Sequence, residues 1–211
     1  MSDGHFIVFE GIDGAGTTTQ IERYAAYLRA KRRHVYVTRQ PSDGPIGSLL
    51  RQGLQGRIEL GRERQAHTMA LLFAADRLDH LAVQIEKNLR DGAVVLCDRY
   101  DLSSLVYQSA TAVGGQDDSV AWIRELNRHA RRPDATVVVD VSPDVAAGRR
   151  RTRGQAIELY EVDELQRQLA ALYAEAEELV PGDCVIHIDG DRSVDEVAQR
   201  ISDALTSVVE A

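Results

Sequence analysis

The stretch that decides the fold lies near the start of the chain, where Phe6–Thr18 reads FIVFEGIDGAGTT. A mostly apolar run leads into three glycines within six positions, and residues compatible with a helix follow. This is the order of a phosphate loop, in which a strand passes through a glycine-rich turn into a helix N-terminus. The glycines let successive backbone N–H groups converge, and the helix adds open donors and the positive end of its dipole.

The loop departs from the standard pattern at one position. The pattern G-x-x-x-x-G-K-[ST] has a lysine where this chain has Thr17, while Thr18 keeps the hydroxyl that helps to hold Mg²⁺. We expect the phosphates of a nucleotide to bind at Gly11, Ile12, Asp13, Gly14, Ala15, Gly16, Thr17, Thr18 and Thr19. The alternative is a glycine-rich turn between a strand and a helix that holds no ligand.

Composition indicates one soluble domain, residues 1–211, because 44% of the 211 residues are hydrophobic and can form a substantial core. The formal net charge of −8 disfavours broad binding to nucleic acid or to an anionic membrane. Cys97 and Cys184 lie in or beside apolar runs, so we expect buried, reduced thiols and a cytoplasmic protein. No signal peptide pattern opens the sequence, and its apolar runs are too short to span a bilayer.

Strands and helices alternate along the chain. The apolar pattern predicts strands at 5–10, 35–38, 93–97, 134–141 and 184–188. It predicts helices at 17–30, 64–90, 102–108, 119–130, 143 to about 153, 162–179 and 194–209, and a loop at 39–45. Because the strands are apolar throughout, they indicate an α/β fold of three layers, a five-stranded parallel sheet with helices on both faces.

Charged residues are expected to meet where these strands end. Ligands of such sheets lie beyond the carboxyl ends of the strands. The residues that follow strands here are Glu10–Thr18, Arg39, Asp98, Arg99 and Asp140. The Asp98 carboxylate can hold Mg²⁺ directly or through water, and the planar fork of Arg99 can bridge phosphates. A surface pair of aspartate and arginine is the alternative.

Two further groups suggest a nucleotide. Phe73 and Arg77 are four residues apart on one helix face, where a ring can stack on a base while a guanidinium donates to its carbonyl. A core phenylalanine is the alternative. Four arginines cluster at Arg149, Arg150, Arg151 and Arg153. They suit a basic flap that closes over a triphosphate, or else a solvated helix face.

Together these residues resemble the bacterial thymidylate kinases over essentially the whole chain. The matching stretches are FEGIDGAG at 9–16, Thr38-Arg39 with Pro41, LFAADR at 72–77, DRY at 98–100 with Ser103, Tyr107 and Gln108, and the arginine-rich segment 149–154. The resemblance implies the P-loop nucleoside monophosphate kinase fold, with a flexible lid at about 149–161, and a homodimer. It implies transfer of a phosphoryl group from ATP to dTMP with Mg²⁺.

The resemblance also implies roles at the matching positions. Asp13 would contact the sugar hydroxyl or the acceptor phosphate, Arg39 would hold that phosphate, and Arg99 would bridge donor and acceptor. Phe73 would stack on thymine and Arg77 would bond its carbonyl oxygen. The rest of the base and sugar pocket would be lined by Ser103, Ser104, Tyr107 and Gln108. Since the loop has no arginine, the charge at the phosphates would come from Arg149, Arg151 and Arg153.

Three departures from the family pattern each remove charge. Thr17 replaces the loop lysine, Gln40 replaces a glutamate, and Leu159 replaces a lid arginine. The surplus of arginine at 149–153 suggests compensation near the phosphates. Two other functions stay open: a kinase of the same fold for another nucleotide, and a nucleotide-binding protein that lost catalysis with its lysine.

Overall fold

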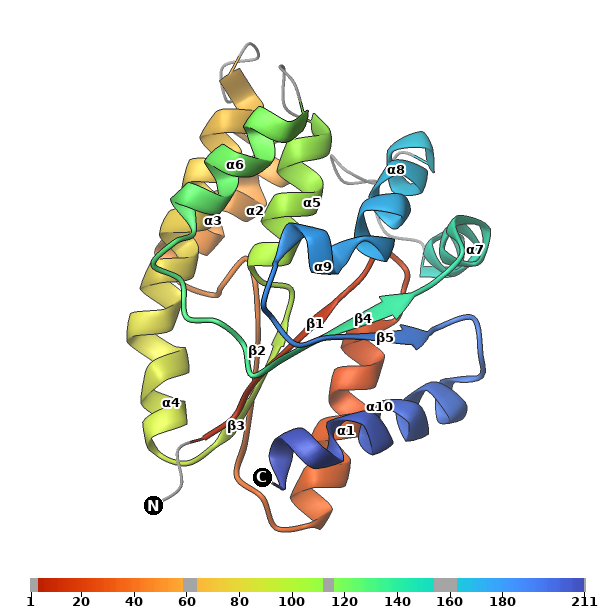
Figure 1. Ribbon diagram of the computed structural model, residues 1–211. Helices are drawn as coiled ribbons and strands as arrows, with labels where there is room; N and C mark the ends of the chain where they lie inside the picture. Colours follow the sequence, from red (N-terminus) through yellow and green to blue (C-terminus); the bar gives the residue numbers. More distant parts are fainter. Residues whose placement is uncertain (1–3, 59–63, 112–115, 154–162, 211) are drawn as a thin grey trace.

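The computed structural model describes residues 4–58, 64–111, 116–153 and 163–210 (Figure 1). Its core is one sheet of five strands in the order β2-β3-β1-β4-β5, and each neighbouring pair is parallel. The strands are β1 (Phe6–Glu10), β2 (Val35–Arg39), β3 (Val94–Asp98), β4 (Ala135–Asp140) and β5 (Val185–Asp189). The predicted five-stranded parallel sheet is therefore confirmed.

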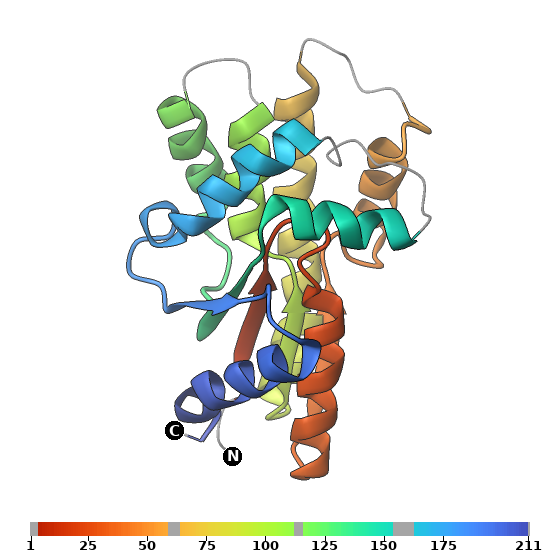
Figure 2. The same cartoon turned by 90° about the vertical axis from the view of Figure 1, so that its right-hand side faces the viewer.

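Helices cover both faces of the sheet (Figures 1 and 2). The described helical segments are α1 (Thr17–Ala30), α2 (Pro45–Leu54), α3 (Gln65–His80), the π-helical η2 (Leu81–Ile85), α4 (Glu86–Arg90), α5 (Asp101–Thr111), α6 (Gln116–Leu126), α7 (Pro143–Arg153), α8 (Asp163–Ala174), α9 (Ala176–Leu179) and α10 (Val194–Val209). Helices α1 and α10 pack together on one face, and α4, α5 and α8 belong to the other. The three-layer prediction is correct.

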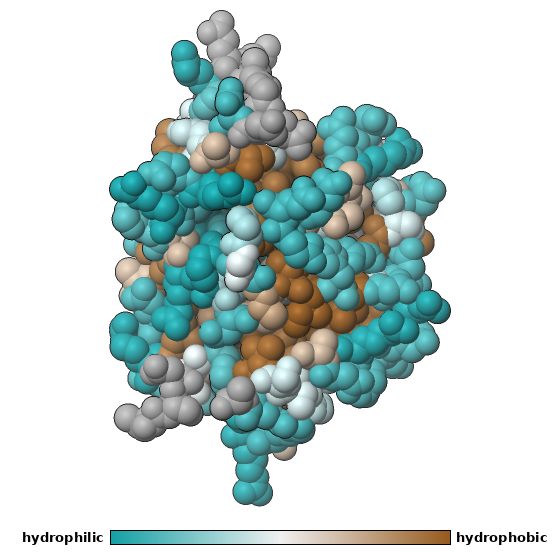
Figure 3. Space-filling model, viewed as in Figure 1, coloured by the Kyte–Doolittle hydropathy of each residue, from teal (hydrophilic) through white to brown (hydrophobic). Residues whose placement is uncertain are grey.

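The alternation of side chains along β1 explains why both faces are covered. All five residues of β1 are buried. Ile7 and Phe9 pack into the core cluster that holds the buried side of α1, whereas Phe6 and Val8 pack with η2 and α4. A strand that is apolar on both faces is stable only between two layers of helices. The surface is mainly hydrophilic, with hydrophobic residues showing near the middle of the view in Figure 3.

The register of the strands brings their ends to one level. Phe9 of β1 lies opposite Asp98 of β3 and Val137 of β4, and Arg39 of β2 also lies opposite Asp98. The phosphate loop, which follows β1, therefore starts beside the ends of its neighbours. This confirms that the polar residues after these strands gather at one edge. In the part of the chain that the structure describes, no helix has the length and apolar character needed to cross a membrane.

Several sequence predictions need correction. Helix α2 was not expected, although Pro45 at its first position is a helix-start signal. The long helix predicted at 64–90 contains the π-helical turn η2, and the one at 162–179 is divided into α8 and α9. Cys97 is buried as expected, but Cys184 is exposed because it precedes the edge strand β5.

Replacing Leu96 by alanine tests the sheet as the centre of the core. Leu96 is 0% exposed on β3, between β1 and β2. We expect Leu96→Ala to lower the free energy of unfolding by about 2–5 kcal/mol, because it removes buried contacts and leaves a cavity. The matched control is Val194→Ala on α10, where the side chain is 46% exposed. Urea unfolding that gave the same midpoint for both variants would contradict this packing.

Candidate active site

The loop after β1 is open for an anion. Gly14 and Gly16 have φ angles of 96° and 94°, in the left-handed region that favours glycine. Gly16 is also the N-cap of α1, which has no side-chain cap and no acidic residue in its first turn. In the described part of the chain, hydrogen bonds are absent from the backbone amides of Gly14, Gly16, Thr17, Thr18 and Thr19. These amides and the positive end of the helix dipole have the character that a phosphate-binding loop needs.

Thr18 and Asp98, predicted as ligands of Mg²⁺, do meet. The Thr18 hydroxyl donates to Oδ2 of Asp98 at 2.6 Å. Oδ1 of Asp98 is buried and has no partner in the described part of the chain. Hydroxyl and carboxylate oxygens suit a hard cation, so the two residues fit Mg²⁺. Among the described residues, no group of three or more His, Cys, Asp or Glu could hold a metal.

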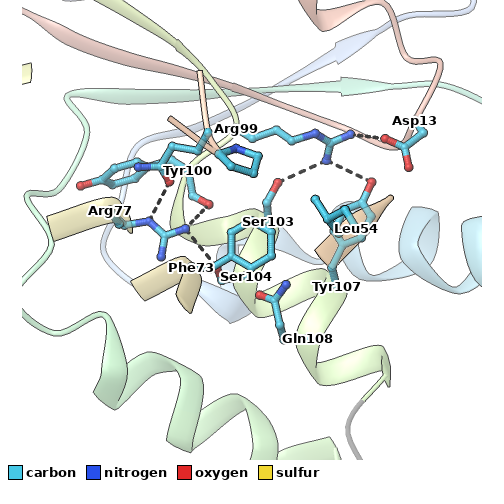
Figure 4. A pocket seen from close by; sticks show the side chains of 12 residues that line it. Asp13, Leu54, Phe73, Arg77, Arg99, Tyr100, Ser103, Ser104, Tyr107 and Gln108 are labelled. Atoms are coloured by element: carbon cyan, nitrogen blue, oxygen red, sulfur yellow. Dashed lines mark hydrogen bonds and ion pairs between the residues drawn. The ribbon is translucent and has the colours of Figure 1, made fainter. Parts of the chain in front are cut away.

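Arg99 links the loop to a cavity (Figure 4). Its φ of 69° lies in the left-handed region, which is strained for any residue with a side chain. One guanidinium nitrogen donates to Oδ1 of Asp13 at 2.5 Å. The other donates to the hydroxyls of Ser103, Tyr107 and Tyr173 at 3.3, 3.0 and 3.4 Å. A planar cation is thus held between the phosphate loop and helix α5.

The Arg99 arrangement rests on Glu10, the last residue of β1. The Glu10 carboxylate is fully buried, and its Oε1 accepts from the backbone amides of Tyr100 and Ser103 at 2.7 and 3.1 Å. Its Oε2 accepts from the hydroxyls of Ser103 and Tyr173 at 2.6 and 2.9 Å. Burial raises the pKa of Glu10, while Arg99 and these hydrogen bonds act in the opposite direction. Glu10 therefore fixes the start of α5 and the hydroxyls that surround Arg99.

Helix α8 supplies two residues that the sequence predictions missed. The side chain of Gln166 is fully buried, and it donates to Oδ2 of Asp13 at 2.9 Å and accepts from the Asp13 amide at 3.1 Å. Tyr173 reaches both Glu10 and Arg99. Their only sequence signal is helical periodicity, which does not distinguish them from other buried positions of the helix.

Beside Arg99 lies a cavity of about 150 Å³. It is lined by Asp13, Gln40, Pro41, Leu54, Phe73, Arg77, Arg99, Tyr100, Ser103, Ser104, Tyr107 and Gln108. All the predicted dTMP residues are in this set except Arg39, which lies at the end of β2 and pairs with Asp43 at 3.0 Å. The Oε1 atom of Gln108 is buried and has no partner in the described part of the chain. A residue that lines the cavity thus carries a hydrogen-bond acceptor, Gln108 Oε1, that a ligand could satisfy.

Arg77 is mainly engaged with the protein itself. It donates to Gln40 Oε1 at 3.0 Å, to Tyr100 O at 2.8 Å and to Ser104 Oγ at 3.0 Å. A fourth bond reaches Asn127 Oδ1. A guanidinium has five N–H groups. These four bonds to described residues therefore leave one N–H of Arg77 that could bind a ligand. Burial lowers the pKa of Arg77, and its partner Gln40 is neutral.

The arginines of α7 that the structure describes differ in their contacts. Arg149 donates to the carbonyls of Ala15 at 3.2 Å and Gly190 at 2.9 Å. Arg150, which was not assigned a direct role, donates to the carbonyl of Asp13 at 2.7 Å. Arg151 is exposed on α7. The side chain of Arg153 and lid residues 154–161 lie outside the described structure, so their roles stay predictions.

Comparison with known proteins identifies the family. A family model described as thymidylate kinase matches residues 9–201. A protein of Pyrobaculum aerophilum named "Probable thymidylate kinase" is 37% identical over 206 residues, which cover 97% of each chain. Proteins of the same name from Pyrobaculum calidifontis and Pyrococcus horikoshii are 40% and 37% identical; the matches cover 80% and 84% of this chain and 80% and 85% of theirs. The chain therefore belongs to the thymidylate kinase family.

Proposed function

We propose that the protein transfers the γ-phosphoryl group of ATP to dTMP, giving dTDP and ADP for the synthesis of dTTP. The observation that carries this proposal is the position of Arg99. Its guanidinium lies between the open phosphate loop and the cavity with the base-binding residues. A cation in that position can stabilise the charge that develops on a phosphoryl group between donor and acceptor. The reaction needs no protein nucleophile.

On the donor side, the amides of the loop and of the first turn of α1 would bind the phosphates of ATP. Thr18 and Asp98 would hold Mg²⁺, since the Thr18 hydroxyl contacts Oδ2 of Asp98 and leaves Oδ1 of the same carboxylate without a partner in the described structure. When bound, the metal would neutralise charge on the phosphate oxygens. The arginines predicted to belong to the lid would add positive charge from α7: Arg149, Arg151 and Arg153. We propose this division of labour, with lid arginines instead of a loop arginine, because the sequence resembles the bacterial enzymes.

On the acceptor side, the cavity fits thymine by its hydrogen-bonding pattern. Phe73 would stack on the base, and the remaining N–H of Arg77 would donate to the O4 carbonyl. The unpartnered Oε1 of Gln108 would accept from N3–H. Cytosine has an amino group in place of O4 and an acceptor at N3, so both polar contacts would be lost. Ser103, Ser104 and Tyr107 would line the rest of the pocket, with Asp13 and Arg39 at the sugar and phosphate.

The assembly and surroundings of the enzyme are also proposals. We propose a single domain that acts as a homodimer, and exposed apolar side chains on neighbouring α3 and η2 support an interface there: Leu71, Leu78 and Val83. The net charge of −8 supports a protein that works in the cytoplasm without nucleic acid or a membrane. The part of α7 and the chain after it at about 149–161 would act as the lid.

The acceptor specificity tests this function directly. In a coupled assay of ADP release with ATP and Mg²⁺, we expect dTMP to react faster than dCMP, dGMP and dAMP. Cytosine and adenine lack the adjacent carbonyl and N–H that Arg77 and Gln108 would bind, and guanine, which has such a pair, is a larger purine base. Phe73→Ala should raise the KM for dTMP about 10-fold or more, since base stacking contributes about 1–3 kcal/mol. The KM for ATP serves as the internal control and should stay nearly constant.

Three outcomes of that assay separate the alternatives. Equal rates with dTMP and dCMP would contradict the base assignment. A different preferred monophosphate would favour a kinase of the same fold for another nucleotide. Binding of ATP without release of ADP for any acceptor would favour a nucleotide-binding protein that lost catalysis with its loop lysine, the alternative suggested by Thr17.

The metal assignment has its own test. Asp98→Asn keeps the size of the side chain but removes its charge, so we expect kcat to fall about 10-fold or more, as for other losses of electrostatic stabilisation. The Mg²⁺ concentration that gives half-maximal rate should rise. Asp118→Asn is the control with the same change of charge on α6, away from the strand ends. A Mg²⁺ dependence of Asp98→Asn that matched the wild type would remove Asp98 from the metal site.

A further inference from the structure

Helix α7 is attached directly to the outside of the phosphate loop. Figure 2 shows α7 crossing above the segment that joins β1 to α1. The approach is close, because a methyl group on Gly14 would lie 2.6 Å from the carbonyl oxygen of Ala146. Arg149 and Arg150 are half-buried at this contact. Arg149 bonds the Ala15 carbonyl and Arg150 bonds the Asp13 carbonyl.

These two carbonyls belong to particular peptide groups. The carbonyl of Asp13 shares its peptide with the amide of Gly14, and the carbonyl of Ala15 shares its peptide with the amide of Gly16. In a planar trans peptide the C=O and N–H point in opposite directions. Both amides are among those without a hydrogen bond in the described part of the chain. Each arginine therefore bonds the back of a peptide whose N–H is available to a phosphate.

A positive charge at the back of a peptide strengthens the donor at its front. Hydrogen bonds in series polarise one another, and the effect is larger where water is excluded. A guanidinium on a carbonyl raises the partial positive charge of the N–H on the same peptide. The guanidinium also places a full positive charge only one peptide group away from the loop amides that would bind phosphate. The lysine missing at position 17 would have supplied charge to the same phosphates.

We propose that Arg149 and Arg150 replace the charge of the loop lysine by acting through the Ala15–Gly16 and Asp13–Gly14 peptides. This inference rests on the proposed function and names the device that would keep the loop active with Thr17. The arginines are positioning residues here, because they contact the loop and not the phosphates. The alternative is that their hydrogen bonds only attach α7 to the loop.

The test compares neutral variants with the restored lysine. Arg149→Gln and Arg150→Gln keep hydrogen-bond donors but lose the charge, and Arg149→Lys and Arg150→Lys keep the charge. We expect the double glutamine variant to lose about 10-fold or more in kcat, with each lysine variant closer to the wild type. Its affinity for ATP should fall more than its affinity for AMP, which has no β- or γ-phosphate. Arg90→Gln, the same change of charge on α4, is the control.

Thr17→Lys then distinguishes charge from attachment. In the wild type this change should alter kcat less than about 3-fold, whereas in the double glutamine variant it should restore about 10-fold, because residues that serve one purpose are not additive. An equal gain in both backgrounds would overturn the proposal, as would full activity of the double glutamine variant. Thermal unfolding of each variant shows whether it folds. If the double glutamine variant does not fold, the kcat values of the lysine variants Arg149→Lys and Arg150→Lys are compared with the wild type instead.

Failure of the proposed function gives a different pattern. If the wild type binds ATP without transferring phosphate, the comparison of ATP with AMP affinity still applies, since it requires only binding. A selective loss of ATP affinity in the double glutamine variant, restored by Thr17→Lys, would then support the arginine device in a protein without kinase activity. Equal losses for ATP and AMP would refute it in either case.

Discussion

The structure depends on a buried carboxylate at the end of the central strand. Glu10 has no exposed surface, so its oxygens must be satisfied within the protein. It meets this need with the backbone amides of Tyr100 and Ser103, just before and within the first turn of α5, and with the hydroxyls of Ser103 and Tyr173. Those hydroxyls also accept from Arg99. One buried charge thus joins the sheet, α5 and α8 and holds the guanidinium that faces the phosphate loop.

The neutral residues Gln40 and Thr17 lie in two separate parts of the site. Gln40 accepts from Arg77 beside the cavity, so within the described residues the hydrogen bonds of this buried guanidinium all go to neutral groups. Because Thr17 is neutral, the positive charge near the loop comes from its backbone amides and from Arg149 and Arg150, which bond the carbonyls of Ala15 and Asp13. Both sites keep a net positive character, which suits the carbonyl of a base in one case and phosphates in the other.

The sequence was sufficient to predict the sheet, the loop and most of the cavity, because each follows from local pattern. Continuous apolar runs give buried parallel strands, and the polar residues after them meet at one edge, as Thr18 and Asp98 do. The contacts of Gln166 and Tyr173 with Asp13, Arg99 and Glu10 join residues far apart in the chain and have no local signature. Nor could periodicity show that Arg150, and not Arg151, bonds the loop.

The most direct test of this account is the single-turnover rate of phosphoryl transfer in Glu10→Gln. This variant keeps the shape of the side chain and removes the charge that organises Ser103, Tyr173 and Arg99. The account predicts a rate about 10-fold or more below the wild type, as for other losses of electrostatic preorganisation, with the affinity for ATP unchanged. Glu22→Gln, the same change on the exposed side of α1, should have the wild-type rate. A folded Glu10→Gln variant with the wild-type rate would contradict the account.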